Sequence, residues 1–278
     1  MVRFISEKIS DYVTRIHGIM DEQMYLVEGR DKAALIDTGT GVGSLKSYVR
    51  SITNKPILVL LTHGHLDHAM GAVEFDSVYL NRKDDYIYKL HQDVKLRKRF
   101  LSESPLFDEV VETDYLPTVS CEYFKDLKEG ELFHLGGITI ETFECPGHTW
   151  GSMVFLLREE RTLITGDACN TFTFLYAGYS TGVSTYEQSL SSLKSKVQGR
   201  YDRIYLSHGA SDAQKRLLEE VLEVCEDIKE GRTDNIPYSH NIDVNGDHGL
   251  IAKAIDVNMC RSDGKTGNIV YNPDRIFE

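Results

Sequence analysis

Short apolar runs alternate with amphipathic stretches along most of the chain, and the spacing of their apolar residues predicts both strands and helices. The first half has four strand-like segments, one helical segment and one continuous apolar run, at 3–9, 11–17, 23–29, 32–37, 43–53 and 57–62. The second half has a similar order of strands and helices, at 131–135, 138–144, 153–157, 162–166, 186–199, 203–206 and 211–230. The sequence therefore predicts an α/β protein with two β-rich halves, each followed by helices.

Two further segments interrupt or extend this pattern. Residues 82–101 have the composition of a charged helix, and 102–126 is irregular because Pro105 and Pro117 break any long element. The tail contains turn signals at Asn245-Gly246 and Asp263-Gly264, which are typical of hairpins. At 278 residues the chain has the length of one α/β domain. We expect a single domain over 1–278, with a helical lid insertion at 81–124 and a C-terminal loop and hairpin extension at 235–278.

The segment 62–68, Thr-His-Gly-His-Leu-Asp-His, places three imidazoles and a carboxylate directly after the apolar run at 57–62. Side chains alternate along a strand, so His63 and His65 leave its end pointing the same way. Asp67 and His68 lie where the chain enters the next helix, so they can serve a second, adjacent metal ion. Neutral imidazole and carboxylate are the ligands that zinc and similar divalent metals prefer.

Three later strands also end on a residue that can bind metal. His148 follows the strand at 138–144, Asp167 follows the strand at 162–166, and His208 follows the strand at 203–206. Sheet proteins tend to build their sites at the carboxyl ends of strands. These residues are therefore candidates for the same metal site as 62–68.

With these motifs in place, the stretch from Leu35-Ile36-Asp37-Thr38-Gly39 to His208-Gly209 resembles the metallo-β-lactamase-fold hydrolase superfamily, and especially its glyoxalase II and lactonase-like branches. The resemblance implies an αββα four-layer sandwich, with two sheets against each other and helices outside. It also implies two divalent metal ions, most simply zinc, with iron or manganese as alternatives.

The resemblance assigns a role to each ligand. His63, His65 and His148 would hold one metal, Asp67, His68 and His208 the second, and Asp167 would bridge the two, because paired cations need an anionic bridge. A hydroxide between the metals would attack a small ester, lactone or thioester, and Asp67 would pass a proton to the leaving group. Asp37 would lie beneath the metal loop and fix the tautomer of a ligand imidazole.

The sequence indicates the residues that contact substrate less clearly than it indicates the metal ligands. The aromatic segment 171–179, which reads as a loop, offers Tyr176 and Tyr179 as a pocket wall, and His240 and His248 lie in C-terminal loops that could reach the site. The lactonase branch carries a tyrosine where this chain has Asn170, so either Tyr176 substitutes or the substrate is not a lactone. A phosphodiesterase or phosphorylcholine-type esterase, a mononuclear iron sulfur dioxygenase, and a metal-binding regulator without turnover stay open as alternatives.

The net charge and the cysteine content limit the classes of partner and the cellular location that we expect. A net charge of −12 and a pI near 5.3 argue against nucleic acid, and we read the basic cluster 95–99 as the solvated face of a helix. Five widely spaced cysteines do not form a disulfide framework, and no stretch approaches 18 apolar residues. We therefore expect a cytoplasmic protein with a small-molecule substrate and no membrane partner, while a homodimer stays open.

Overall fold

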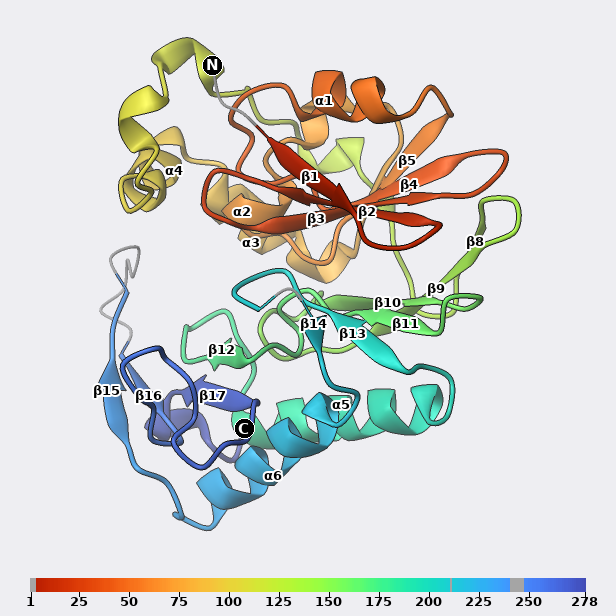
Figure 1. The fold of residues 1–278 in the computed structure, drawn as a ribbon. Coiled ribbons are helices and arrows are strands. Elements are labelled where there is room, and N and C mark those ends of the chain that lie inside the picture. The colour runs from red at the N-terminus through yellow and green to blue at the C-terminus, as the bar shows by residue number, and fades with distance from the viewer. Residues whose placement is uncertain (1–3, 211, 241–247) are drawn as a thin grey trace. The chain divides into compact units, whose positions relative to one another are not determined.

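The computed structural model describes residues 4–210, 212–240 and 248–278 (Figure 1). Its contacts divide the chain into two compact units. The first unit comprises Met1–Thr142 with Leu157–Glu160, and the second comprises Phe143–Leu156 with Arg161–Glu278.

The first unit is built on a seven-stranded sheet whose strands follow one another in sequence order. Its strands are β1 (Ile5–Lys8), β2 (Val13–His17), β3 (Gln23–Glu28), β4 (Ala33–Ile36), β5 (Ile57–Leu60), β6 (Val78–Leu80) and β7 (Lys125–Asp126). The pairs from β1 to β4 are antiparallel, and those from β4 to β7 are parallel. Parallel neighbours end at the same edge, so the residues that follow β4 and β5 lie close together.

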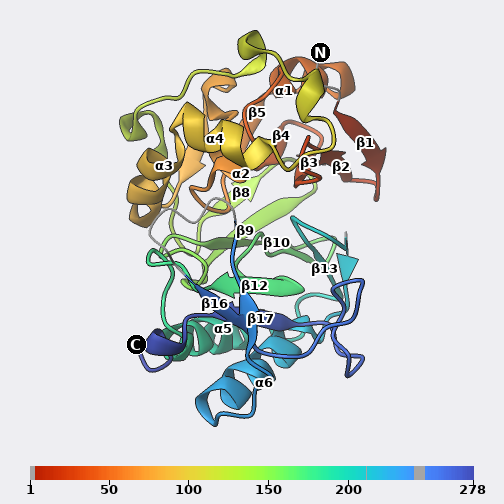
Figure 2. The same cartoon turned by 90° about the vertical axis from the view of Figure 1, so that its left-hand side faces the viewer.

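Helices flank this sheet (Figures 1 and 2). Helix α1 (Leu45–Ile52) begins at the cap Ser44, whose side chain accepts a hydrogen bond from the Ser47 amide, and it buries Leu45 and Val49. The short helix α2 (Leu66–Ala69) follows β5, and a 3-10 turn at Ala72–Glu74 continues it. The helix expected to begin at Asp67 and His68 is therefore present, but it starts at Leu66 and is short.

The segment predicted as one charged helix over 82–101 is instead a 3-10 turn at Arg82–Asp84 followed by two helices, α3 (Asp85–His91) and α4 (Val94–Leu101). The break occurs where Asp93 caps α4 by accepting a hydrogen bond from the Lys95 amide. Reading 95–99 as a solvated face was wrong at one position, because Arg97 is only 1% exposed. The irregular stretch after α4 contains three 3-10 turns, at Phe107–Glu109, Glu112–Asp114 and Cys121–Tyr123.

A second sheet has the order β14-β13-β11-β10-β9-β8. Its strands are β8 (Leu132–His134), β9 (Thr139–Glu144), β10 (Met153–Leu157), β11 (Thr162–Ile164), β13 (Arg203–Tyr205) and β14 (Asp212–Ala213). The boundary between the two units falls within β9, so β8 and the start of β9 belong to the first unit.

In the second unit, helices α5 (Val183–Val197) and α6 (Leu217–Lys229) lie side by side (Figures 1 and 2). They pack on the strands through one apolar cluster that includes Val154 and Leu163. The helix predicted at 211–230 begins only at Leu217, because Asp212 and Ala213 pair with β13 as β14. The local apolar spacing of 217–228 was correct, but the start of the helix was not.

The segment 171–179, expected as a loop, contains the strand β12 (Phe172–Leu175). It pairs in parallel with β17 (Asn268–Tyr271), and β16 (Gly249–Ile251) and β15 (Ile236–Tyr238) complete a four-stranded sheet. The C-terminal tail thus supplies three strands. Its Asn245-Gly246 signal lies outside the described residues.

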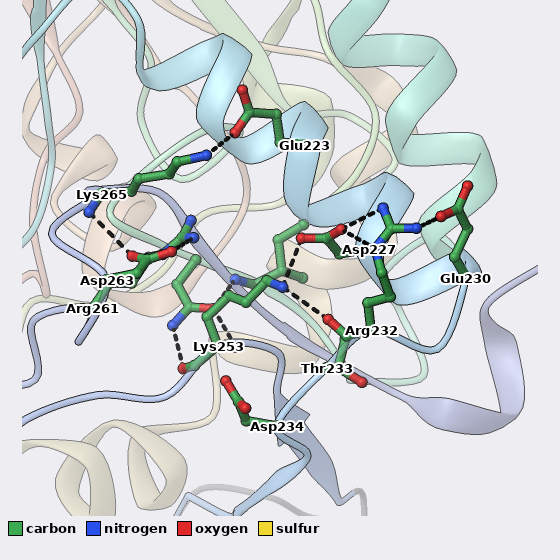
Figure 3. A network of polar contacts seen from close by, with 12 residues as sticks. Glu223, Asp227, Glu230, Arg232, Thr233, Asp234, Lys253, Arg261, Asp263 and Lys265 are labelled. Atoms are coloured by element: carbon green, nitrogen blue, oxygen red, sulfur yellow. Dashed lines mark hydrogen bonds and ion pairs between the residues drawn. The ribbon is translucent and has the colours of Figure 1, made fainter.

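Charged contacts tie this tail to α6 (Figure 3). The Asp227 carboxylate accepts hydrogen bonds from Arg232 at 2.6 Å and lies 2.6 Å from the Lys253 ammonium. Lys265 pairs with Glu223 one turn earlier on the helix. Within the described ranges, no helix is long and apolar enough to cross a membrane.

The five cysteines all lie in the described part of the chain, and none forms a disulfide. Cys121, Cys145, Cys169 and Cys225 are buried, and burial raises the pKa of Cys145 to about 12. The thiolate is the reactive form, so buried thiols with raised pKa values react slowly. Cys260 is exposed.

We expect a chromogenic disulfide reagent at pH 8 to modify one thiol rapidly in the native protein and all five in denaturant. A Cys260→Ser variant should lose the rapid phase while keeping the slow ones. Two or more rapidly reacting thiols in the native protein would contradict the burial of the other four cysteines.

Candidate metal centre

The first unit gathers the three imidazoles of 62–68 into one buried cluster. β5 delivers the chain into the loop that carries His63 and His65, and α2 then carries His68. The ring centroid of His63 lies 4.6 Å from that of His65 and 4.1 Å from that of His68. The sequence motif is therefore a compact cluster of donor atoms in the folded chain.

A single carboxylate, that of Asp37, holds this cluster in place through hydrogen bonds. Asp37 follows β4 with a left-handed backbone (φ 62°), which aspartate tolerates better than most residues. Its Oδ1 accepts the Thr62 amide at 2.7 Å, and its Oδ2 accepts the Thr62 hydroxyl and His68 Nδ1, each at 2.8 Å. An ionised carboxylate can only accept, so His68 Nδ1 carries the proton and Nε2 keeps its lone pair for a metal.

The same carboxylate also acts on His63 through Thr62. The Thr62 hydroxyl lies 2.9 Å from His63 Nδ1. Since that hydroxyl donates to Asp37, it accepts from His63 Nδ1, and His63 Nε2 is left as the ligand atom. Asp37 thus fixes the tautomers of two imidazoles at once.

The spacing of the donor atoms fits a divalent metal. Two donors on one tetrahedral zinc, each at about 2.0–2.1 Å, lie roughly 3.3 Å apart. His63 Nε2 is 3.0 Å from His65 Nδ1, and His68 Nε2 is 3.7 Å from an Asp67 carboxylate oxygen. Both pairs are close to the separation that a shared metal requires.

Sequence reasoning missed two residues that hold the loop in place. The buried Asp84 accepts a hydrogen bond from the Gly64 amide at 2.9 Å. His91, at the end of α3, stacks on His65 with ring centroids 4.5 Å apart, and its Nδ1 accepts the Leu66 amide at 3.3 Å. No local pattern signals either contact, because both residues lie about 20 or more positions away in the insertion. The lid role of 81–124 stays a prediction, but its first part packs on the metal loop.

Glu22 is a third residue that the sequence did not single out. Its buried carboxylate accepts the Met20 amide at 2.8 Å and the Thr40 amide at 3.3 Å. Burial raises the pKa of Glu22 from its ordinary 4.5 to about 7, the nearby Asp67 carboxylate adds to the rise, and the backbone amides oppose it. A buried carboxyl group therefore titrates near neutrality close to the histidine cluster.

In the second unit, His148 lies in the loop that follows β9. The His148 backbone carbonyl accepts a hydrogen bond from the Ser180 hydroxyl at 2.8 Å, and its Nδ1 donates to the carbonyl of Phe174 at 2.9 Å. A carbonyl can only accept, so His148 Nε2 is the atom left to bind a metal. Strand β12, which carries Phe174, therefore orients this imidazole.

Asp167 presents one oxygen to two imidazoles. Its Oδ2 lies 3.6 Å from His148 Nε2 and 3.5 Å from His208 Nε2. β11 and β13 are parallel neighbours, so Asp167 and His208 emerge at the same edge. The His208 side chain is about one-third exposed, whereas His148 is buried. A carboxylate oxygen flanked in this way can bridge two cations.

The candidate substrate residues differ in burial and in their contacts. Asn170 is buried, and its side-chain oxygen accepts the Thr171 amide at 2.7 Å, which shapes the turn after Asp167. Tyr176 is 7% exposed, with its ring centroid 5.5 Å from that of Tyr238. Tyr179 and His240 are half-buried. Their contact with substrate stays a prediction.

Comparison with known proteins identifies the family. Residues 20–208, more than half of the chain, match the family model described as the metallo-beta-lactamase superfamily. The chain belongs to this superfamily. The predicted resemblance is confirmed, and so is the fold class, an α/β sandwich of the metallo-β-lactamase type.

Relatives within the superfamily are distant. The chain is 29% identical over 228 residues to the atrochrysone carboxyl ACP thioesterase of Aspergillus fumigatus, covering 77% of this chain and 61% of that protein. It is 28% identical over 186 residues to the hydroxyacylglutathione hydrolase GloC of Haemophilus influenzae, covering 64% and 79%. It thus spans about three-fifths of the length of the Aspergillus relative.

A solved structure shares the fold. The metallo-beta-lactamase from Pontibacter korlensis superimposes with a TM-score of 0.56 at 19% identity, covering 80% of this chain and 98% of that one. At this identity the likeness concerns the fold alone.

The raised pKa of Glu22 gives a pH dependence with a definite sign. The protonated carboxyl stabilises the folded state below the unfolded pKa, and this contribution is lost as the pH rises through about 7. Between pH 5 and 8, the metal-free wild type should therefore lose about 2–3 kcal/mol of unfolding free energy relative to a Glu22→Gln variant.

Urea unfolding of both metal-free proteins at several pH values measures this difference. Asp21→Asn, an exposed change in the same turn, is the matched control and should track the wild type. A gap between wild type and Glu22→Gln that stays constant over this range would show that Glu22 does not titrate there.

Proposed function

We propose that this chain is a metal-dependent hydrolase that cleaves a thioester or ester bond in a small molecule, with two divalent metal ions at its centre. The ligands of the first metal would be His63, His65 and His148. Those of the second would be Asp67, His68 and His208, with Asp167 bridging both.

The observation that carries this proposal is the position of Asp167. One carboxylate oxygen lies within 3.6 Å of the ligand nitrogens of His148 and His208, which the proposal assigns to different metals. The tautomer of His148 is already set by the Phe174 carbonyl. In the first unit, Asp37 sets the tautomers of His63 and His68 in the same sense. The contacts therefore direct Nε2 of His63, His68 and His148 to act as the ligand atom.

The metals, when bound, would lower the pKa of a water molecule and polarise the scissile carbonyl. The chain supplies the rest. Asp37 holds the imidazoles in the required orientation, and burial of the cluster keeps bulk water away from their donor atoms. Asp67, whose side chain is partly exposed beside His68, is placed to pass a proton to the leaving group.

The relatives favour a thioester as the substrate. The Aspergillus protein is named as a thioesterase, and the Haemophilus protein as a hydroxyacylglutathione hydrolase. The second unit adds an apolar surface on the strand that orients His148, where Phe174, Tyr176 and Tyr238 form an aromatic cluster. Such a surface suits an apolar acyl group more than a polar one.

The bridge can be tested directly. Asp167→Asn keeps the shape of the side chain but removes the negative charge that offsets two cations. We expect the variant to lose about one equivalent of metal and, by analogy with the removal of other charge-stabilising groups, at least ~10²-fold in kcat.

Metal analysis and turnover are measured together, with Asp202→Asn, an exposed aspartate paired with Arg161, as the control. A fully loaded and fully active Asp167→Asn protein would refute the two-metal proposal. One iron per chain in the wild type would instead favour dioxygenase chemistry.

The substrate class is tested with the purified metal-loaded protein. We expect kcat/KM for acyl thioesters to exceed that for lactones, aryl esters and phosphodiesters. Phe174→Ala should raise KM for the longer acyl chains with metal content unchanged, because the His148 contact uses the backbone carbonyl and not the ring. Preference for phosphodiesters over all acyl compounds would overturn the assignment.

A further inference from the structure

One short loop of the first unit supports the proposed metal-binding residues and is itself held by two buried side chains, Glu22 and Arg97. This 37–41 loop, Asp-Thr-Gly-Thr-Gly, begins with the carboxylate that orients His63 and His68. It continues along α2, where the amide and the hydroxyl of Thr38 both donate to the His68 carbonyl, at 2.7 and 3.0 Å. The Gly39 carbonyl accepts the Met70 amide at 3.1 Å.

The backbone of the 37–41 loop packs directly against the backbone at the end of α2. A Cβ atom on Gly41 would lie 2.4 Å from the Met70 carbonyl oxygen, and one on Gly71 would lie 2.4 Å from the Thr38 carbonyl oxygen. Backbones packed this closely move as one body. A displacement of the 37–41 loop would therefore displace His68.

Glu22 holds the loop from its amide side. The carboxylate accepts the Thr40 amide through one oxygen and the Met20 amide through the other. A Cβ on Gly39 would lie only 3.1 Å from it. Glu22 thus joins the loop to the 18–22 turn between β2 and β3.

Arg97 holds the loop from its carbonyl side. Its Nη2 donates to the carbonyls of Thr40 at 2.9 Å and Gly41 at 2.7 Å, and its Nη1 donates to that of Leu116 at 2.9 Å. Burial lowers the pKa of Arg97, but a guanidinium stays charged in proteins. This side chain therefore places a buried positive charge on the opposite side of Thr40 from Glu22.

We propose that Glu22 and Arg97 are positioning residues. They hold Thr40 through its amide and its carbonyl, and so fix the positions of Asp37 and His68 for metal binding. The Arg97 guanidinium donates charge-assisted hydrogen bonds, which are stronger than neutral ones, and a buried charge without partners is costly. The Glu22 carboxyl group accepts one amide on each oxygen, so both contacts resist displacement of the loop. The grip also couples two outlying segments to the metal loop. Ser104, just after α4, donates to the Ile19 carbonyl at 2.7 Å and closes the connection.

The inference rests on the proposed function only in that 62–68 binds metal. Its test uses Glu22→Gln and Arg97→Met. Glutamine brings an N–H donor towards an amide that needs an acceptor. Methionine removes the guanidinium from the carbonyls of Thr40, Gly41 and Leu116, of which that of Gly41 keeps the Leu116 amide as a donor. Asp21→Asn and Arg99→Met are exposed changes in the same turn and the same helix, and they serve as matched controls. Arg97→Lys keeps the charge and can restore part of the hydrogen bonding.

Two readouts separate positioning from general stability. The first is zinc affinity, measured by competition with a chelator on protein shown to be folded by circular dichroism. We expect Glu22→Gln and Arg97→Met to weaken at least one zinc equivalent by about 10- to 100-fold, Arg97→Lys to recover part of this, and the controls to match the wild type. The second is hydrogen exchange of the metal-free chain, which should become faster in peptides covering 37–41 and 62–68.

Variants that melt at a lower temperature but keep wild-type zinc affinity and wild-type exchange in these peptides would overturn the inference. If Arg97→Met does not fold, Arg97→Lys and Glu22→Gln decide the matter with the same two readouts. A wild-type chain that binds no divalent metal would contradict the proposed function instead. Hydrogen exchange of the metal-free variants would still test whether Glu22 and Arg97 hold Thr40 in place.

Discussion

The first unit's part of the candidate metal centre depends on the Asp37 carboxylate. It is buried, and it accepts the Thr62 amide, the Thr62 hydroxyl and His68 Nδ1. Three donors satisfy the charge and make its burial tolerable, while the same bonds leave the Nε2 atoms of His63 and His68 to act as ligands. Because Asp37 follows β4 and Thr62 follows β5, the parallel pairing of these strands brings the carboxylate beneath the loop. The sheet topology is therefore what makes the ligand cluster possible.

The candidate ligand residues could be proposed from the sequence because their pattern is local. Three histidines within six positions after an apolar run can be read without a structure, and so can a single ligand at the end of each later strand. The strands β2, β3 and β4 were predicted to within a few residues, because their apolar runs are buried almost continuously. Periodicity carries such information directly.

The supports of the site could not be predicted in the same way. Asp84, His91 and Arg97 reach the metal loop or the 37–41 loop from an insertion whose pattern indicates only charged helix. Their burial is decided by tertiary contacts that leave no periodic trace. The alternation Phe172-Thr173-Phe174-Leu175 could have identified β12, but its partner β17 lies almost a hundred residues away. The pairing of these four residues with β17 therefore cannot be inferred from the sequence near them.

Strand β12 shows how ligand orientation and substrate choice can be kept apart on one element. Its backbone holds His148 through the Phe174 carbonyl, and that contact does not depend on which side chain stands at 174. Its side chains, with Tyr238, form the aromatic surface that we propose for the acyl group. Substitutions there can change the shape of this surface while the imidazole keeps its tautomer and its direction. The Asp37 support has no such freedom, because its contacts are made by the side chain itself. We therefore infer that specificity in this chain can vary at the surface of β12, whereas the 37–41 loop tolerates little change.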